Sequence, residues 1–285
     1  MSFAGVEDGI ALRLTALFRH HRAKPTYLLS PEVIRDDASA ETLRKLAPQC
    51  ELGAHLHGEY AEPGAFEPDE TTAFQRDYPE DVERAKLTYL TRLFQARFDA
   101  MPRSFRAGRF GLGPCSIGIL EQLGYTVDSS VTPFMDWSDK AAGLSFMGAP
   151  TQPYHPDAKR PEMRGASAIL EVPVTIRPRA AQKIPMIGKR LDPRWLRPTK
   201  TGGKALVALA SDEIAATRSD RTPIVLNAMF HNVEVIPNAS PYAATEGEAS
   251  EILSRLGELL AFAVREGIPI IGLADVPELF TSRRA

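Results

Sequence analysis

Short β-rich runs alternate with amphipathic helical patterns along almost the whole chain, and this alternation constrains the fold more than any other feature. The runs lie at about 26–29, 50–57, 104–110, 125–131, 169–176, 223–230 and 268–273. Patterns with helical spacing separate them, at about 9–23, 40–46, 81–98, 114–123, 204–218 and 245–266. Strands that alternate with helices usually pair in parallel, because each helix carries the chain back across the sheet. The sequence therefore predicts an α/β fold, either a barrel or a doubly wound sheet.

The chain has the size and composition of one soluble domain. Its 285 residues are 44% hydrophobic and 25% charged, which is ordinary for a globular protein. No internal repeat and no linker divides residues 1–285 into two domains. The sequence has no basic leader and no apolar run of about 18 residues, so we expect a soluble, cytoplasmic protein with no membrane partner.

The charge balance excludes a general attraction to nucleic acid or anionic lipid, because 34 basic residues face 36 acidic ones. The stretch 177–204 is an exception, with nine basic residues against the single acid Asp192. It could attract an anionic substrate, although a solvated basic loop is the simpler interpretation. A sugar-phosphate or nucleotide binder that uses this stretch is the weakest function considered, since no glycine-rich phosphate loop accompanies it.

Two histidines separated by one residue end the apolar run 51–58. Side chains at i and i+2 of a strand point to the same face, so His55 and His57 are expected to project together. Neutral imidazole is the commonest protein ligand for zinc and also suits iron, copper and nickel. Two ligands do not close a metal site, so the chain must supply a third or bind weakly. A histidine pair packed at a sheet edge is the structural alternative.

Three further polar residues, Arg106, Asp128 and His231, fall at or near the ends of predicted strands. Parallel strands bring their carboxyl ends to one edge, where barrels and open α/β sheets bind ligands. Each residue alone has an ordinary explanation, as a surface ion pair, a turn residue and a loop cap. Their coincidence with His55 and His57 on one rim predicts a single functional site.

These motifs, in this order, resemble the polysaccharide deacetylase family, carbohydrate esterase family four. Gly53-Ala-His-Leu-His57 resembles the metal-binding histidine motif, in the HxH form that some branches carry. Phe105-Arg-Ala-Gly-Arg-Phe-Gly111 resembles the arginine motif, and Phe230-His-Asn-Val-Glu234 the late histidine motif. The resemblance runs from about Thr26, where the second strand of the family begins, to the last predicted strand.

The resemblance implies a distorted (β/α) barrel, incomplete at its N-terminus, with one divalent metal, usually Zn²⁺. It implies a hydrolase that removes an acyl group from an N-acetylated sugar or a related small amide through a metal-activated water. By the same resemblance, His55 and His57 bind the metal and His231 is the general acid. Arg106 orients an active-site carboxylate, and Asp128 lies where its strand opens on the site.

Two departures from the family pattern bear on activity. Many members carry their two histidines four residues apart, which would put the second ligand at Glu59 instead of His57. The first motif of the family, a pair of aspartates at the end of strand one, supplies the base and the third ligand. Here Val6-Glu-Asp-Gly9 is a superficial match that abuts the first predicted helix, which Asp8 is expected to cap. We therefore expect the chain to begin after that strand, and a non-catalytic relative that binds a sugar or a metal is the alternative to an enzyme.

Overall fold

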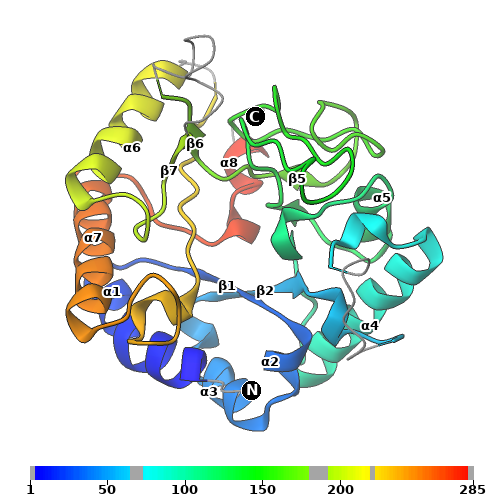
Figure 1. Ribbon diagram of the computed structural model, residues 1–285, viewed down its shortest axis with the longest axis horizontal. Helices are drawn as coiled ribbons and strands as arrows, with labels where there is room; N and C mark the ends of the chain where they lie inside the picture. The colour runs from blue at the N-terminus through cyan, green and yellow to red at the C-terminus, as the bar shows by residue number, and fades with distance from the viewer. Residues whose placement is uncertain (1–3, 65–72, 180–191, 219–221, 282–285) are drawn as a thin grey trace.

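A five-stranded parallel sheet lies at the centre of the structure, a computed structural model that describes residues 4–64, 73–179, 192–218 and 222–281. The strand order is β1-β2-β3-β4-β5 (Figure 1). The strands are β1 (Thr26–Leu29), β2 (Glu51–Leu56), β3 (Ser104–Ala107), β4 (Val127–Asp128) and β5 (Leu170–Glu171). The predicted α/β fold with parallel strands is confirmed.

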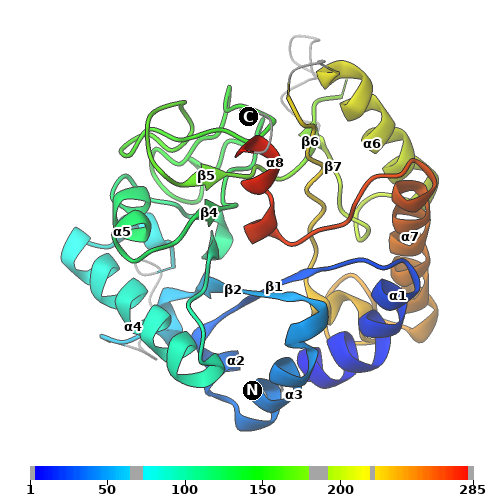
Figure 2. The same cartoon turned by 180° about the vertical axis from the view of Figure 1, so that it is seen from behind.

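Helices flank this sheet (Figures 1 and 2), and its apolar side chains, such as those of Leu56 and Phe105, lie in the main core. The helical spacing at 81–98 is confirmed by α4 (Glu80–Phe98), whose Leu87, Leu90 and Phe94 lie in the main core. On another side, α6 (Gly203–Thr217) packs against α7 (Glu246–Arg265), which begins with a capping box formed by Thr245 and Glu248. The other α-helices are α1 (Thr15–His20), α2 (Pro31–Arg35), α3 (Asp37–Leu46), α5 (Ser116–Gln122) and α8 (Glu278–Thr281).

The first helix begins earlier than predicted. It is a π-helix, η1 (Gly5–Leu14), that continues into α1, so Asp8 lies inside its first turns, exposed, and the predicted cap is wrong. Close packing explains the earlier start, because η1 lies against the 3₁₀ turn η9 (Asn232–Val235). A Cβ atom on Gly9 would come within 2.7 Å of the Asn232 carbonyl oxygen. Only a residue without a side chain permits this approach.

The amino end of the sheet is joined by the side chain of Glu51. Its carboxylate accepts hydrogen bonds from Thr26 Oγ1 at 2.7 Å and from Ser104 Oγ at 2.5 Å, the first residues of β1 and β3. It also accepts from the backbone N–H of Ala274, at 2.9 Å, which fastens the C-terminal segment to the sheet. Glu51 therefore has a structural role at the amino end of the strands. The polar residues predicted to form the functional site lie at the opposite, carboxyl end.

Two predicted strands, at 223–230 and 268–273, are wrong, because neither segment joins a ladder in the described part of the chain. They make only isolated backbone hydrogen bonds, such as Thr175 N–H to the Asn227 carbonyl and Lys24 N–H to the Ile270 carbonyl. Their apolar side chains are mostly half-buried. An apolar run predicts burial, but a strand also needs a neighbouring backbone, which is a tertiary property.

The predicted strand 169–176 is split into β5 and a second piece, β6 (Ile176–Arg177), which pairs antiparallel with β7 (Arg194–Trp195). Most of the basic stretch follows β6, and its residues 180–191 lie outside the described residues. Residues 133–168, which separate the predicted strands 125–131 and 169–176, form isolated bridges but no named strand or helix. Within the described ranges, no helix has the length and apolarity needed to cross a membrane.

Candidate active site

His55 and His57 lie side by side at the end of β2, with ring centroids 4.7 Å apart and ring planes at 81°. His55 Nδ1 is 2.7 Å from the carbonyl oxygen of Arg106, its register partner on β3. A carbonyl can only accept, so Nδ1 carries the proton and Nε2 keeps its lone pair. The bond to β3 therefore leaves Nε2 of His55 with a lone pair that can bind a ligand.

His55 is held in its neutral form. Burial lowers the pKa of His55 well below its ordinary value, and the neighbouring charges of His57, Arg106 and His231 lower it further. The hydrogen bond to the Arg106 carbonyl opposes this effect without reversing it. Neutral imidazole is the form that binds metals. The electrostatic effect of His231 on His55 also shows that the late histidine lies on the same side of the molecule as the pair.

Glu59 and Arg109 lie beside His57. The buried carboxylate of Glu59 accepts a hydrogen bond from Arg109 Nη2 at 2.7 Å. His57 Nδ1 is 3.5 Å from Glu59 Oε1 and 3.4 Å from Arg109 Nη1, distances too long to fix the tautomer of the ring. Burial alone would raise the pKa of Glu59, but hydrogen bonds with His57 and Arg109 lower it to about 2. Glu59 is therefore ionised and lies on the Nδ1 side of His57.

The loop that carries Glu59 is anchored by Lys86 from α4. The buried Lys86 ammonium donates to the carbonyl oxygens of Gly58 at 2.9 Å, Ala61 at 2.7 Å and Pro63 at 2.5 Å. These bonds use all the donors of the ammonium group. Sequence reasoning missed this role, because Lys86 has no distinctive context within its amphipathic helix.

His231 is oriented by Glu234, three residues later in η9. His231 Nδ1 donates to Glu234 Oε1 at 2.7 Å, and no bond to Nε2 of its exposed ring is present among the described residues. Glu234 also accepts hydrogen bonds from Arg197 and Thr199. Burial alone would raise the pKa of Glu234, but the hydrogen bonds from His231 and Thr199 and the charge of Arg197 lower it. Sequence reasoning quoted Glu234 within its motif without giving it a role; the i, i+3 spacing was the available signal.

Arg106 lies on β3 with its guanidinium buried. Nε donates to the Ser129 carbonyl at 2.6 Å and Nη2 to Ser129 Oγ at 2.7 Å. Burial lowers the pKa of Arg106 to about 10, although the charges of Glu171 and Asp128 oppose this. No carboxylate in the described ranges forms an ion pair with it. Its predicted role, orienting a carboxylate, stays a prediction.

Asp128 forms a buried acidic pair with Glu171, its register neighbour on β5. Ser130 Oγ donates to Asp128 Oδ1 at 2.7 Å, and Val131 N–H donates to Glu171 Oε1 at 3.0 Å. Burial and the Asp128 charge raise the pKa of Glu171 well above its ordinary value, and burial raises the pKa of Asp128 as well. Both side chains are fully buried, and the catalytic role predicted for Asp128 stays a prediction. Sequence reasoning did not select Glu171.

The two histidines do not form a complete metal site with their described neighbours. In the ranges that the structure describes, no group of three His, Cys, Asp or Glu side chains could hold a metal ion. Glu7 and Asp8 are exposed on η1, and Glu7 accepts a hydrogen bond from Thr42. Neither carboxylate therefore completes the pair here.

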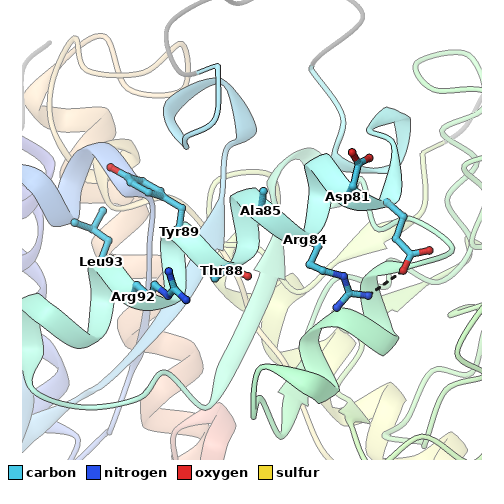
Figure 3. A pocket seen from close by; sticks show the side chains of 8 residues that line it. Asp81, Arg84, Ala85, Thr88, Tyr89, Arg92 and Leu93 are labelled. Atoms are coloured by element: carbon cyan, nitrogen blue, oxygen red, sulfur yellow. Dashed lines mark hydrogen bonds and ion pairs between the residues drawn. The ribbon is translucent and has the colours of Figure 1, made fainter.

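A groove along α4 is lined by none of the candidate site residues. Its volume is about 960 Å³, and the described residues that line it all belong to α4, between Glu80 and Leu93. Figure 3 shows these side chains spread along the helix, with Arg84 bonded to Glu80. A surface along one helix lacks the converging polar groups of a ligand site, so we assign it no function.

Comparisons with known proteins support the fold. No family model and no curated protein matches the sequence. Among solved structures, Puue allantoinase matches with a TM-score of 0.60 and 13% identity, covering 98% of this chain and 74% of that chain. A protein from Mycobacterium smegmatis assigned to the polysaccharide deacetylases matches with a TM-score of 0.56 and 16% identity, covering 99% and 78%. A protein from Pseudomonas aeruginosa PAO1 with the same assignment matches with a TM-score of 0.54 and 14% identity, covering 98% and 73%. The chain therefore has the polysaccharide deacetylase fold, as the motifs predicted.

Proposed function

We propose that this chain is a metal-dependent hydrolase that removes an acyl group from an N-acylated sugar or a related small amide. The observation that carries the proposal is the way in which hydrogen bonds orient the histidine rings. His55 and His231 each have Nδ1 bonded to an acceptor, which leaves Nε2 free, and His57 lies against His55. Histidines that bind metals or transfer protons are commonly held in this way. The fold shared with proteins named as a deacetylase and an allantoinase supports the same reaction class.

His55 and His57 would hold the metal, and imidazole ligands suit Zn²⁺, the ion proposed here, as well as iron, copper and nickel. When bound, the metal would supply a Lewis acid for the amide carbonyl and lower the pKa of a water molecule. The donor set fits such an ion but is only part of its ligand shell. The remaining positions would be filled by water, substrate or a further protein group, because no group of three His, Cys, Asp or Glu side chains among the described residues could hold the ion.

His231 would protonate the leaving nitrogen from Nε2. Its Nδ1–H bond to ionised Glu234 stabilises the imidazolium that precedes this transfer. General acid catalysis of this kind typically raises the rate about 10²–10⁴-fold.

A second candidate function, a non-catalytic carbohydrate- or metal-binding relative, is favoured by one observation: no described carboxylate accepts a hydrogen bond from Arg106. A general base at that position is therefore not provided by the described residues.

Elemental analysis and a hydrolysis screen test the proposal together. The purified chain is loaded with Zn²⁺, dialysed, and assayed with N-acetylated chitooligosaccharides and cyclic amides. We expect one bound metal per chain and release of acetate or ring-opened product. His231→Asn is the matched control, and it should keep the metal and lose hydrolysis. Metal without turnover supports the non-catalytic relative, whereas neither metal nor turnover contradicts the hydrolase and leaves only a carbohydrate-binding relative.

A further inference from the structure

The end of the basic stretch is bonded to the carboxylate that orients His231. Arg197 and Thr199 follow β7, and both donate to Glu234, Arg197 to Oε1 and Thr199 to Oε2. Glu234 is 1% exposed and Arg197 8% exposed, so these groups are shielded from water. Both carboxylate oxygens are thereby occupied, one of them jointly by Arg197 and His231. This part of the basic stretch is not a solvated loop.

The hydrogen bonds that Arg197 and Thr199 donate to Glu234 also affect the charge and the orientation of the His231 ring. A buried carboxylate with an imidazole as its only partner strongly favours the imidazolium form. Arg197 opposes that charge directly, and Thr199 draws electron density from the carboxylate through a neutral hydrogen bond. The carboxylate can also no longer rotate, because both of its oxygens are held. Its Oε1 therefore stays aimed at Nδ1 of His231.

We propose that Arg197 and Thr199 are positioning residues that act through Glu234: they keep His231 as the Nδ1–H tautomer and prevent its ring from being locked as imidazolium. The use of His231 in hydrolysis rests on the proposed function. The state of the ring does not, and it can be measured in metal-free protein without any substrate.

Few other charged groups act on His231. His55, on β2, lies within electrostatic reach. Most charged side chains of η1 and α7, the two helices packed against η9, are bonded to other groups, and Asp8 on η1 is exposed. On η1, Glu7 accepts from Thr42 and Arg13 pairs with Glu246 of α7. On α7, Arg255 pairs with Glu251 and donates to the backbone carbonyl of Pro198. The ring therefore depends mainly on Glu234 and the two residues that hold it.

Nitrogen NMR of protein labelled in its six histidines measures both the tautomer and the pKa of His231. His231→Asn identifies the signal. Glu234→Gln removes the anion that favours the imidazolium form and should lower the pKa of His231. Arg197→Met and Thr199→Val should shift it in the opposite direction, and the Nδ1–H tautomer should lose its dominance in all three variants. Arg194→Met, which removes an Arg of the same stretch paired with exposed Asp212, is the matched control and should change neither quantity.

A His231 pKa that falls in Glu234→Gln and rises in Arg197→Met and Thr199→Val supports the proposal, because a general loosening of the fold would not shift it in opposite directions. If Arg197→Met does not fold, Thr199→Val carries the test alone. An unchanged His231 tautomer and pKa in folded Thr199→Val, or shifts of the same size in Arg194→Met, overturn it. If the wild-type chain hydrolyses an amide, its pH profile should move in the same directions as the NMR values. If no hydrolysis is found, the proposed function fails, while the NMR result still decides the roles of Arg197 and Thr199.

Discussion

Two groups of one histidine, one glutamate and one arginine flank the candidate site, and they differ in how tightly they are held. The β2-side group consists of His57, Glu59 and Arg109. The η9-side group consists of His231, Glu234 and Arg197. The histidine to glutamate distance is 3.5 Å in the first and 2.7 Å in the second. The arginine side chain is 41% exposed in the first and 10% exposed in the second.

This difference matches the two chemical roles proposed. A general acid must have the correct tautomer and orientation before substrate arrives, and the buried η9-side group provides both. A metal ligand can complete its orientation when the ion binds, so the β2-side group can remain looser. In the β2-side group, the β2 ladder positions the chain up to Leu56 and Lys86 anchors the loop beyond it. In the η9-side group, the β6/β7 ladder ends at Trp195, just before Arg197, whereas no described ladder includes His231 or Glu234, which side-chain bonds hold in place.

The largest expected effect is a loss of bound metal, which should occur when the proposed metal ligands are replaced but not when the proposed general acid is replaced. The double variant with His55→Ala and His57→Ala should lose all bound metal, because both imidazole ligands are removed. His231→Ala should keep the metal content of the wild type. Elemental analysis after dialysis measures both. Stoichiometric metal in the double variant would show that the site is misplaced, and metal loss in His231→Ala would remove the distinction between the two groups.

The next largest effect concerns stability. Arg197→Met leaves the Glu234 carboxylate buried with its main counter-charge removed, which typically costs about 3–5 kcal/mol of unfolding free energy. Arg109→Met removes an exposed partner of Glu59, and we expect a loss of about 0–1 kcal/mol. Urea unfolding at pH 8 compares the two variants. Equal losses would mean that the two groups are equally buried in solution, against the geometry described above.

The substitution Arg106→Lys tests whether the guanidinium of Arg106 has a role at the candidate site. The guanidinium holds Ser129 through two bonds at once, whereas lysine is a single charged point that cannot do so. We expect kcat/KM to fall by about 100-fold, in the range for the loss of one oriented donor. Circular dichroism and metal content should stay at the wild-type values. Full activity in this variant would show that Arg106 has no role at the site.

The sequence predicted the features that depend on local pattern. The histidine pair follows from period-two alternation at the end of a strand, and the α4 stripe and the α7 capping box follow from helical spacing. Each of these needs only a few consecutive residues. The order of strands and helices then predicted the parallel sheet, since each crossover returns the chain to the same edge.

The sequence did not predict contacts between distant segments. Arg197 and Glu234 are 37 residues apart, and Lys86 and Gly58 are 28 residues apart. Nothing in the neighbourhood of either charged residue distinguishes it from a solvated one. The same limit explains the error at 223–230, whose apolar composition is typical of a strand. Its ladder depends on a neighbouring backbone that local sequence does not describe.

The smallest effect concerns the pH dependence of the β2-side group. The pKa of Glu59 in the folded chain is about 2, below the model-peptide value of 4.5. A lowered pKa means that ionised Glu59 stabilises the fold above about pH 4.5, and this contribution is lost as the pH falls from 4.5 to 2. Because Arg109 is 41% exposed, solvent screening limits the contribution to less than about 1 kcal/mol. Glu59→Gln should therefore flatten the unfolding free energy against pH in this window and leave the slope above pH 6 unchanged. Glu59→Asp, which keeps the charge, is the control. An unaltered slope in Glu59→Gln would mean that Glu59 is as free in solution as in the unfolded chain, and the β2-side group would then reduce to His57 alone.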